Sequence, residues 1–171
     1  HHNIHFGRAW KGTFDEVIRR GELMSDPSLL VCNPSRSDAT VAPEGRHTYY
    51  VLAPTPNLER AALDWRGDLA RTYADELIRT LEQRGYVGFA DGVEVSRIVT
   101  PADWADQGMA AGTPFAAAHN LFQTGPFRPA NLHRTLSNVV FTGSGTQPGV
   151  GVPMVLISGK LAAARVTGGQ R

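Results

Sequence analysis

The chain has 171 residues, with 17 Lys and Arg against 16 Asp and Glu and 42% hydrophobic residues, values typical of globular proteins. Its formal net charge of +1 argues against a general nucleic-acid coat or a polybasic membrane anchor. The single cysteine, Cys32, excludes an intramolecular disulfide and a metal site built from several cysteines. No run of about 18 apolar residues is long enough to cross a bilayer. This length allows one domain or two small lobes.

Short elements fill the first third of the chain. Four are predicted, each bounded by glycine, proline or polar residues: a strand beginning at His5, a helix from Thr13 to a stop at Gly21, a buried strand over 28–33, and a strand over 46–53 that follows a turn at 42–45. Cys32 lies in the apolar run of the second strand, which favours a buried and inert thiol over a catalytic nucleophile.

The middle of the chain contains the longest predicted helix, over 63–84. Its apolar stripe recurs every four residues at Trp65, Leu69, Tyr73, Leu77 and Leu81. One face of this helix therefore covers a sheet or another helix. Gly85 ends it, and the alternating residues 93–99 predict a strand. Thr100 and Pro101 are then a well-formed N-cap and first residue for a helix that includes Trp104.

Periodicity fails over 108–134, a stretch rich in glycine and proline that we interpret as an ordered loop. A short buried strand is expected over 138–142, then a glycine-rich turn over 143–153 and a helix over 154–166. Small residues in that helix, among them Ser158, allow close packing on a sheet or a cofactor. The predicted fold class is α+β, a mixed sheet with amphipathic helices that ends in a strand-turn-helix.

The glycine-rich turn is the most informative segment. Such a turn lets backbone amides and a helix N-terminus approach an anionic or electron-rich ligand. A tight connection between strand and helix with no ligand explains the pattern equally well. The dinucleotide fingerprint Gly-x-Gly-x-x-Gly is excluded, because after Gly143 and Gly145 its last position is Pro148.

Residues 143–153, with the sequence GSGTQPGVGVP, resemble the C-terminal flavin-binding signature of the bacterial-type phytoene desaturases, an FAD-dependent carotenoid desaturase family. Residues 2–7, 42–54 and 127–131 agree with the same family in the same order. The resemblance covers nearly the whole chain and implies that it is the C-terminal third of a longer enzyme. Two positions depart from the family pattern. Gln147 replaces the usual histidine, so this position cannot titrate, and Ser144 stands where the family usually has alanine or a similar small residue.

The resemblance implies part of a two-lobe α/β FAD oxidoreductase. Residues 1–136 would belong to the substrate-side lobe, and residues 137–171 would be the C-terminal strand-turn-helix of the FAD-binding domain. The cofactor-binding residues carried over from the signature are Gly143, Gly145, Thr146, Gly151, Val152, Pro153 and Met154. The helix N-terminus would then face the flavin where negative charge develops on reduction.

Candidates for contact with substrate come from the aromatic residues and histidines. Trp104, Phe115, Phe122 and Phe127 would line an apolar tunnel, although plain core packing is the more common role of such side chains. His119 and His133 are weak candidates for a general base. No metal site is expected at His1, His2 and His5, because no cysteine or carboxylate follows them at ligand spacing.

The implied reaction desaturates a carotenoid precursor such as phytoene, with hydride transfer to flavin N5 followed by loss of a proton. The enzyme would be cytoplasmic and peripheral to the membrane that holds its polyene substrate. We expect the 171 residues alone to lack FAD, to be inactive without the N-terminal FAD-binding half, and to self-associate through exposed apolar surface. Nucleic acid is not expected as a partner. The alternatives are a related carotenoid isomerase, ketolase or saturase, or a non-catalytic binding or oligomerisation module.

Overall fold

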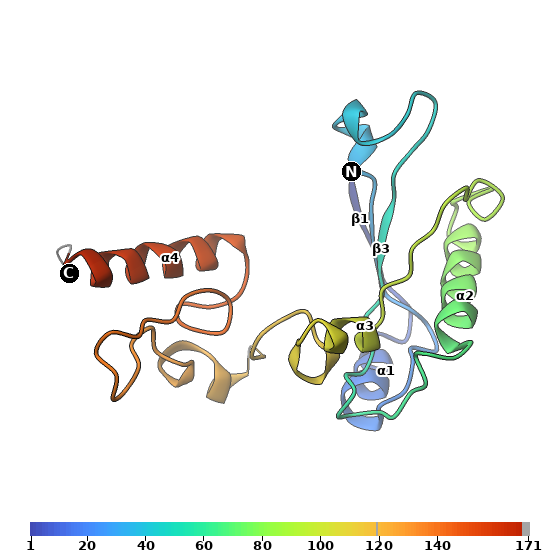
Figure 1. Cartoon of the computed structure of the whole chain (residues 1–171). Coiled ribbons are helices and arrows are strands. Elements are labelled where there is room, and N and C mark those ends of the chain that lie inside the picture. The colour runs from blue at the N-terminus through green and yellow to red at the C-terminus, as the bar shows by residue number, and fades with distance from the viewer. Residues whose placement is uncertain (119, 169–171) are drawn as a thin grey trace. The chain divides into compact units, whose positions relative to one another are not determined.

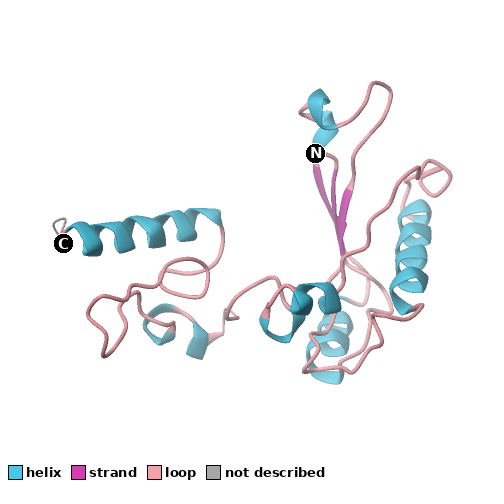
Figure 2. Ribbon diagram, in the orientation of Figure 1, coloured by secondary structure: helices cyan, strands magenta, loops and turns pink. Residues whose placement is uncertain are grey.

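The computed structural model describes residues 1–118 and 120–168. It divides into two compact units, His1–Gly112 and Thr113–Arg171, whose helices and strands are shown in Figures 1 and 2. Helices and a small sheet occur in the first unit, and loops with one long helix form the second. The α+β prediction is confirmed at this level.

The sheet of the first unit has three antiparallel strands in the order β1 (His2–His5), β2 (Leu29–Cys32) and β3 (Tyr50–Leu52). In the described residues it is antiparallel throughout, so the expected mixed sheet is wrong. The strand predicted at the N-terminus ends at His5 instead of beginning there. Of the predicted strand over 46–53, the part that pairs with β2 is Tyr50–Leu52.

Side chains of β2 alternate between the two faces of the sheet. Leu29 and Val31 are buried, whereas Leu30 and Cys32 are half-buried on the opposite face, as the two-residue period of a strand requires. The strand is therefore confirmed, but Cys32 is less buried than expected.

Helix α2 (Leu69–Gln83) covers the sheet with its apolar stripe. Leu81 is completely buried against Leu29 and Val31. The predicted amphipathic helix is confirmed, although it begins six residues later than expected. The preceding residues instead form turns, in which the Asp64 carboxylate accepts hydrogen bonds from the amides of Arg66 and Gly67, and Trp65 reaches the core from these turns.

The remaining elements of the first unit are short. They are α1 (Trp10–Phe14), a π-helical segment (Asp15–Arg20), 3₁₀ turns at Pro34–Arg36, Ala39–Val41 and Ala110–Gly112, and α3 (Pro101–Asp106). Gly21 ends the π-helical segment with φ of 71°, as predicted. Residues 93–99 form no strand, and Val95 is 92% exposed, because no described strand lies beside them to pair with.

Helix α3 begins with the predicted cap. The Thr100 hydroxyl accepts a hydrogen bond from the Asp103 amide at 3.3 Å, and the Asp103 carboxylate accepts one from the Thr100 amide at 2.7 Å. This reciprocal pair is a capping box. The hydroxyl and amide of Thr100 hold the pKa of the Asp103 carboxyl below its ordinary value.

The second unit contains 3₁₀ turns at Leu121–Gln123 and Gly125–Phe127 and the helix α4 (Val152–Thr167), drawn in red in Figure 1. The strand expected over 138–142 is reduced to a single bridge between Leu132 and Val140. Among the helices of the described residues, none combines the length and the apolar character that crossing a bilayer requires.

Candidate functional site

The glycine-rich turn of the second unit is fixed to helix α4 by Ser158. This serine is fully buried, and its hydroxyl accepts a hydrogen bond from the Gly143 amide at 3.1 Å. The buried Asn131 side chain donates to the same hydroxyl at 3.3 Å and to the carbonyls of Phe141 and Gln147, both at 3.1 Å. The start of the turn, its middle and the helix therefore form one hydrogen-bonded assembly.

Arg128 fixes the next part of the turn. Its side chain is buried, at 2% exposure, and its guanidinium donates to the carbonyls of Ser144 and Thr146 in the turn. It also donates to the carbonyls of Ala117 and Gln123 in the preceding loop. Five N–H donors in a rigid fork suit arginine to this task. The arginine thus ties the loop to the turn through four backbone oxygens.

Three glycines of the turn have open space where a side chain would project. A methyl group added to Gly143, Gly145 or Gly151 would meet no heavy atom within 4 Å beyond the neighbouring residues. Gly143 and Gly151 have φ of 104° and 100°, a left-handed conformation that glycine adopts without strain. The first amides of α4 follow directly after Gly151, and the first-turn amides of a helix have no intrahelical partner. The Gly143 amide is already bound to Ser158 and Pro153 has no N–H, so the helix N-terminus offers a ligand the amides of Val152 and Met154.

Such a surface fits an anionic or electron-rich ligand that comes close to the backbone. The absent Cβ atoms leave room for it, and the buried network behind the turn keeps the donors in place.

The predicted cofactor residues differ in how they face this surface. Thr146 is buried, and its hydroxyl donates to the Pro129 carbonyl at 2.6 Å, so its side chain stabilises the turn from within. Val152 is 71% exposed, Pro153 is exposed and Met154 is half-buried. Their role in holding a cofactor stays a prediction, as does that of Gly143, Gly145 and Gly151.

The side chain of Gln147, the departure from the family pattern, is engaged in the fold. Its amide nitrogen donates to the Gly125 carbonyl at 3.1 Å. It also lines a hollow of about 350 Å³ together with Pro148, Leu161 and Arg165. A glutamine can make this contact at any pH, because its amide does not titrate.

The candidate substrate residues fall in both units. Trp104 is half-buried on α3 of the first unit. Phe115, Phe122 and Phe127 belong to the second unit and are 60%, 75% and 57% exposed. The ring centroids of Phe122 and Phe127 lie 5.8 Å apart. Within the second unit the structure brings Phe122 and Phe127 into contact, and the tunnel-lining role of all four residues stays a prediction.

Of the two candidate bases, His119 lies outside the described residues. His133 is half-buried, and its Nδ1 accepts hydrogen bonds from the amides of Thr135 and Leu136 at 3.2 and 3.0 Å. The neutral ring therefore carries its proton on Nε2. In this arrangement the Nε2–H of His133 can donate a hydrogen bond, but its Nδ1 lone pair is occupied by the two amides, so its role as a base stays a prediction.

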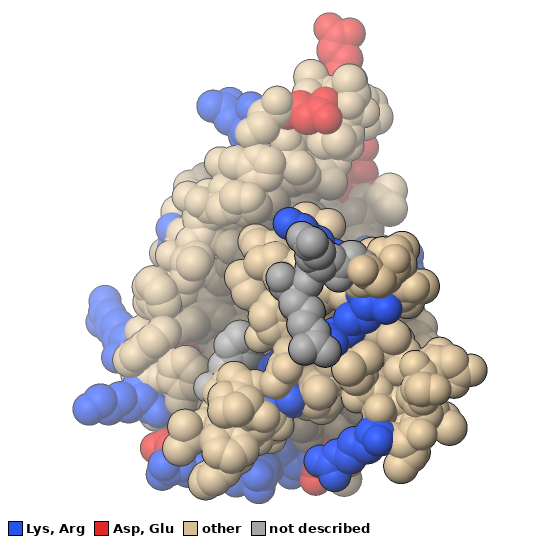
Figure 3. Space-filling view, turned by 90° about the vertical axis from the view of Figure 1, so that its left-hand side faces the viewer, with Lys and Arg blue, Asp and Glu red and all other residues tan. Residues whose placement is uncertain are grey.

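Arg128 and Asn131 are functional candidates that the sequence reasoning missed. A signal was present, because all sixteen Asp and Glu residues precede Gln107, whereas five Lys and Arg follow it. The second unit therefore contains no acidic side chain and is cationic. On the face drawn in Figure 3, Lys and Arg cover more of the surface than Asp and Glu. A segment of one charge is a reason to search for an anionic ligand.

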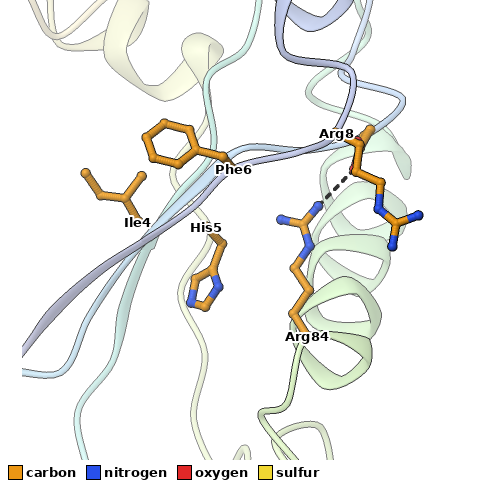
Figure 4. Close-up of a pocket in the computed structure, with 6 residues that line it drawn as sticks. Ile4, His5, Phe6, Arg8 and Arg84 are labelled. Carbon is orange, nitrogen blue, oxygen red and sulfur yellow. Dashed lines mark hydrogen bonds and ion pairs between the residues drawn. The ribbon is translucent and has the colours of Figure 1, made fainter.

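The first unit has a hollow of its own, of about 500 Å³ (Figure 4). It is lined by Ile4, His5, Phe6, Arg8, Asp26 and Arg84. The Ala9 amide, followed by the Arg8 amide and the Arg84 guanidinium, holds the pKa of Asp26 below its usual range. The Arg84 guanidinium contacts the Asp26 carboxylate at 3.0 Å. Because Asp26 pairs with Arg84 and accepts from the Ala9 amide, the carboxylate of this hollow is already satisfied within the protein.

One further cluster lies on the sheet. Ligand atoms of His1, His2 and Cys32 all fall within 4.8 Å of one another, since His2 and Cys32 are opposite each other in the β1–β2 register. The sequence spacing did not reveal this proximity. The expectation that the chain holds no metal stays a prediction.

Comparison with known proteins matches residues 11–167 to the family model described as "Flavin containing amine oxidoreductase". Similar curated proteins include a "Phytoene dehydrogenase" of Streptomyces griseus, 56% identical over 98% of this chain and 33% of that protein. A "zeta-carotene-forming phytoene desaturase" of Myxococcus xanthus is 40% identical over 97% of the chain and 32% of its own length. A lycopene-forming phytoene desaturase of a Paracoccus species is 38% identical over 95% of the chain and 32% of its own length.

The chain thus spans about a third of the length of the curated relatives that it matches. The family match covers the α2 helix, the glycine-rich turn and the whole of α4. With this extent of match, the chain belongs to the flavin-containing amine oxidoreductase family.

Proposed function

We propose that the chain is a portion of an FAD-dependent phytoene desaturase, an oxidoreductase that extends the conjugation of a carotenoid precursor. The observation that carries this proposal is the turn over 143–153, which combines an open, glycine-lined backbone surface with a rigid buried network behind it. The names of the similar proteins favour desaturation over the isomerase, ketolase, saturase and binding-module alternatives.

The protein's own residues have three tasks in this reaction. The backbone of Gly143, Gly145 and Gly151 binds and orients the cofactor, together with the first turn of α4 (Val152, Pro153 and Met154). Asn131 and Ser158 keep that backbone in place. Apolar side chains exclude water from the reacting carbon pair, a task that we assign to Trp104, Phe115, Phe122 and Phe127. FAD, when bound, supplies the redox chemistry by accepting the hydrogen and electrons taken from the substrate.

The two-lobe arrangement follows from the same proposal. Residues 1–136 belong functionally to the substrate-side lobe, and residues 137–171 complete the FAD-binding domain. In the structure, the loop over 113–136 packs with the turn through Arg128 and Asn131. This loop is therefore held against the turn that we assign to the cofactor.

Exposed apolar residues on α4 support a missing partner. Val152, Leu156 and Val166 are 71%, 68% and 74% exposed. Several large apolar side chains exposed on one helix are typical of a surface that another part of a protein covers. We assign their covering to the rest of the FAD-binding domain. The isolated chain should self-associate through them, and the whole enzyme should contact the membrane peripherally to reach its polyene.

The test is a comparison of the full-length protein with the 171-residue chain. The full-length protein should bind one FAD and convert phytoene into products with longer conjugation, which absorption spectra of extracted carotenoids detect. The chain alone should bind no FAD and leave phytoene unchanged. A full-length protein that purifies without FAD and does not bind added FAD would overturn the proposal.

A further inference from the structure

Arg128 is a buried cation without an anionic partner in its own unit. Its guanidinium is satisfied in hydrogen bonds by four carbonyl oxygens, yet carbonyl dipoles leave its full positive charge in place. The second unit contains no Asp or Glu to neutralise it. A charge removed from water is costly unless an opposite charge compensates it. The counter-charge of Arg128 must therefore come from outside this unit.

The contacts of Arg128 also set the direction of the neighbouring amide. Its guanidinium holds the carbonyl of Ser144 inward. In a trans peptide the carbonyl and the following N–H point in opposite directions, so the N–H of Gly145 is turned away from the arginine. The side of Gly145 where a Cβ would project is open. Arg128 thus polarises an amide donor that points away from it.

The cation and the amide act on the same region of the turn. Gly145 lies directly after Ser144, and the Thr146 carbonyl after it is also bound to Arg128, at 3.2 Å. A ligand atom that accepts a hydrogen bond from the Gly145 amide is therefore separated from the Arg128 guanidinium by little more than one peptide unit. In such a low-dielectric setting an anion gains more from a nearby cation than it would in water.

We propose that Arg128 is the electrostatic anchor of the cofactor site, and that the diphosphate of FAD supplies its counter-charge. This inference rests on the proposed function. It makes Arg128 a positioning residue with two effects. The hydrogen bonds of its guanidinium shape the turn, and its positive charge favours an anionic flavin over a neutral flavin with the same ring system.

The experiment uses the full-length protein stripped of flavin and measures the affinity for FAD and for riboflavin, which shares the ring but has no phosphate. Fluorescence quenching of each flavin gives the dissociation constant without any turnover. The variants are Arg128→Met, which removes charge and fork, and Arg128→Lys, which keeps the charge. Arg134→Met is the matched control, because it removes an exposed arginine of the same unit.

We expect Arg128→Met to weaken FAD binding at least tenfold more than riboflavin binding. Arg128→Lys should retain most of the preference for FAD, and Arg134→Met should leave both affinities within about twofold of the parent, as expected for a screened surface charge. Added salt should weaken FAD binding to the parent more than to Arg128→Met. Circular dichroism on every variant checks that the fold is retained.

Several outcomes would overturn the inference. Equal weakening of FAD and riboflavin by Arg128→Met would mean that the arginine only shapes the turn. Unchanged FAD binding would mean that a carboxylate elsewhere in the full-length protein neutralises it. In both cases the parent still binds FAD and the proposed function stands, whereas a parent that binds no FAD overturns both. An unfolded Arg128→Met protein leaves the decision to Arg128→Lys, whose loss of FAD preference would contradict the charge role.

Discussion

Gly145→Ala separates the stability of the turn from its ability to hold a cofactor. Gly145 does not have the left-handed backbone of Gly143 and Gly151, so alanine fits without strain. Its added methyl group would meet no protein atom within 4 Å beyond the neighbouring residues. The substitution therefore changes the ligand surface and leaves the buried network untouched.

The expected magnitudes follow from that geometry. In a glycine position that alanine can adopt, the substitution stabilises a protein by roughly 0.4–1 kcal/mol through the unfolded chain. A ligand displaced by the methyl group loses a hydrogen bond to a charged group, which is worth about 1.5–3 kcal/mol. Since 1.4 kcal/mol is a factor of ten, FAD affinity should fall by about ten- to a hundredfold.

The assay measures thermal unfolding and FAD affinity in the same full-length preparation. Gly159→Ala is the control, because Gly159 lies inside α4, where its added methyl group comes no closer than 4.0 Å to the Thr142 hydroxyl. That variant should gain up to about 1 kcal/mol in stability and bind FAD normally. A Gly145→Ala protein that is stable and binds FAD like the parent would refute the assignment of the turn to the cofactor.

Three further variants test the fold. Leu81→Ala should lower the free energy of unfolding by about 2–5 kcal/mol in urea titrations, because it leaves a cavity in the core. Ser158→Ala should cost about 1–3 kcal/mol, since it removes the acceptor of the Gly143 amide, and a cost near zero would show that the network is not needed. Thr100→Ala should cost about 1 kcal/mol. The Asp103 pKa is lowered in the folded state, so the ionised carboxylate stabilises the fold. This stabilisation is present above about pH 4 and is lost as the pH falls through the folded pKa. Thermal melts of Thr100→Ala should therefore depend less on pH in that acidic range than those of the parent.

Local sequence signals predicted the elements whose causes are local. The cap at Thr100 is a contact between residues three apart, and the stripe that ends in Leu81 is a property of one helix. Gly21 ends its helical segment because glycine adopts a positive φ. In these places the residues that cause the structure are neighbours in the chain, so the sequence displays them together.

The failures have a non-local cause. Residues 93–99 alternate as a strand should, but pairing needs a free strand edge, and the pattern cannot show whether one exists. Cys32 is half-buried because the core lies on one face of β2 only. The role of Ser158 was hidden for the same reason, since its partners Asn131 and Gly143 are 27 and 15 residues away. A small residue in a helix indicates close packing without telling which groups approach.

Resemblance to a family located the candidate site more sharply than any residue pattern did. The pattern alone left the turn over 143–153 equally consistent with a structural connection. The structure adds the open glycine surface and the buried Arg128 behind it. The restriction of acidic residues to the part of the chain before Gln107 would have pointed to an anionic ligand from the sequence itself.

The most direct test of the account is an anaerobic single-turnover reaction of the full-length protein with phytoene in lipid vesicles. The oxidised flavin band near roughly 450 nm should bleach as a product with longer conjugation forms, one flavin reduced for each double bond introduced. A flavin that stays oxidised while phytoene disappears, or a protein that desaturates phytoene with no flavin bound, would contradict the account.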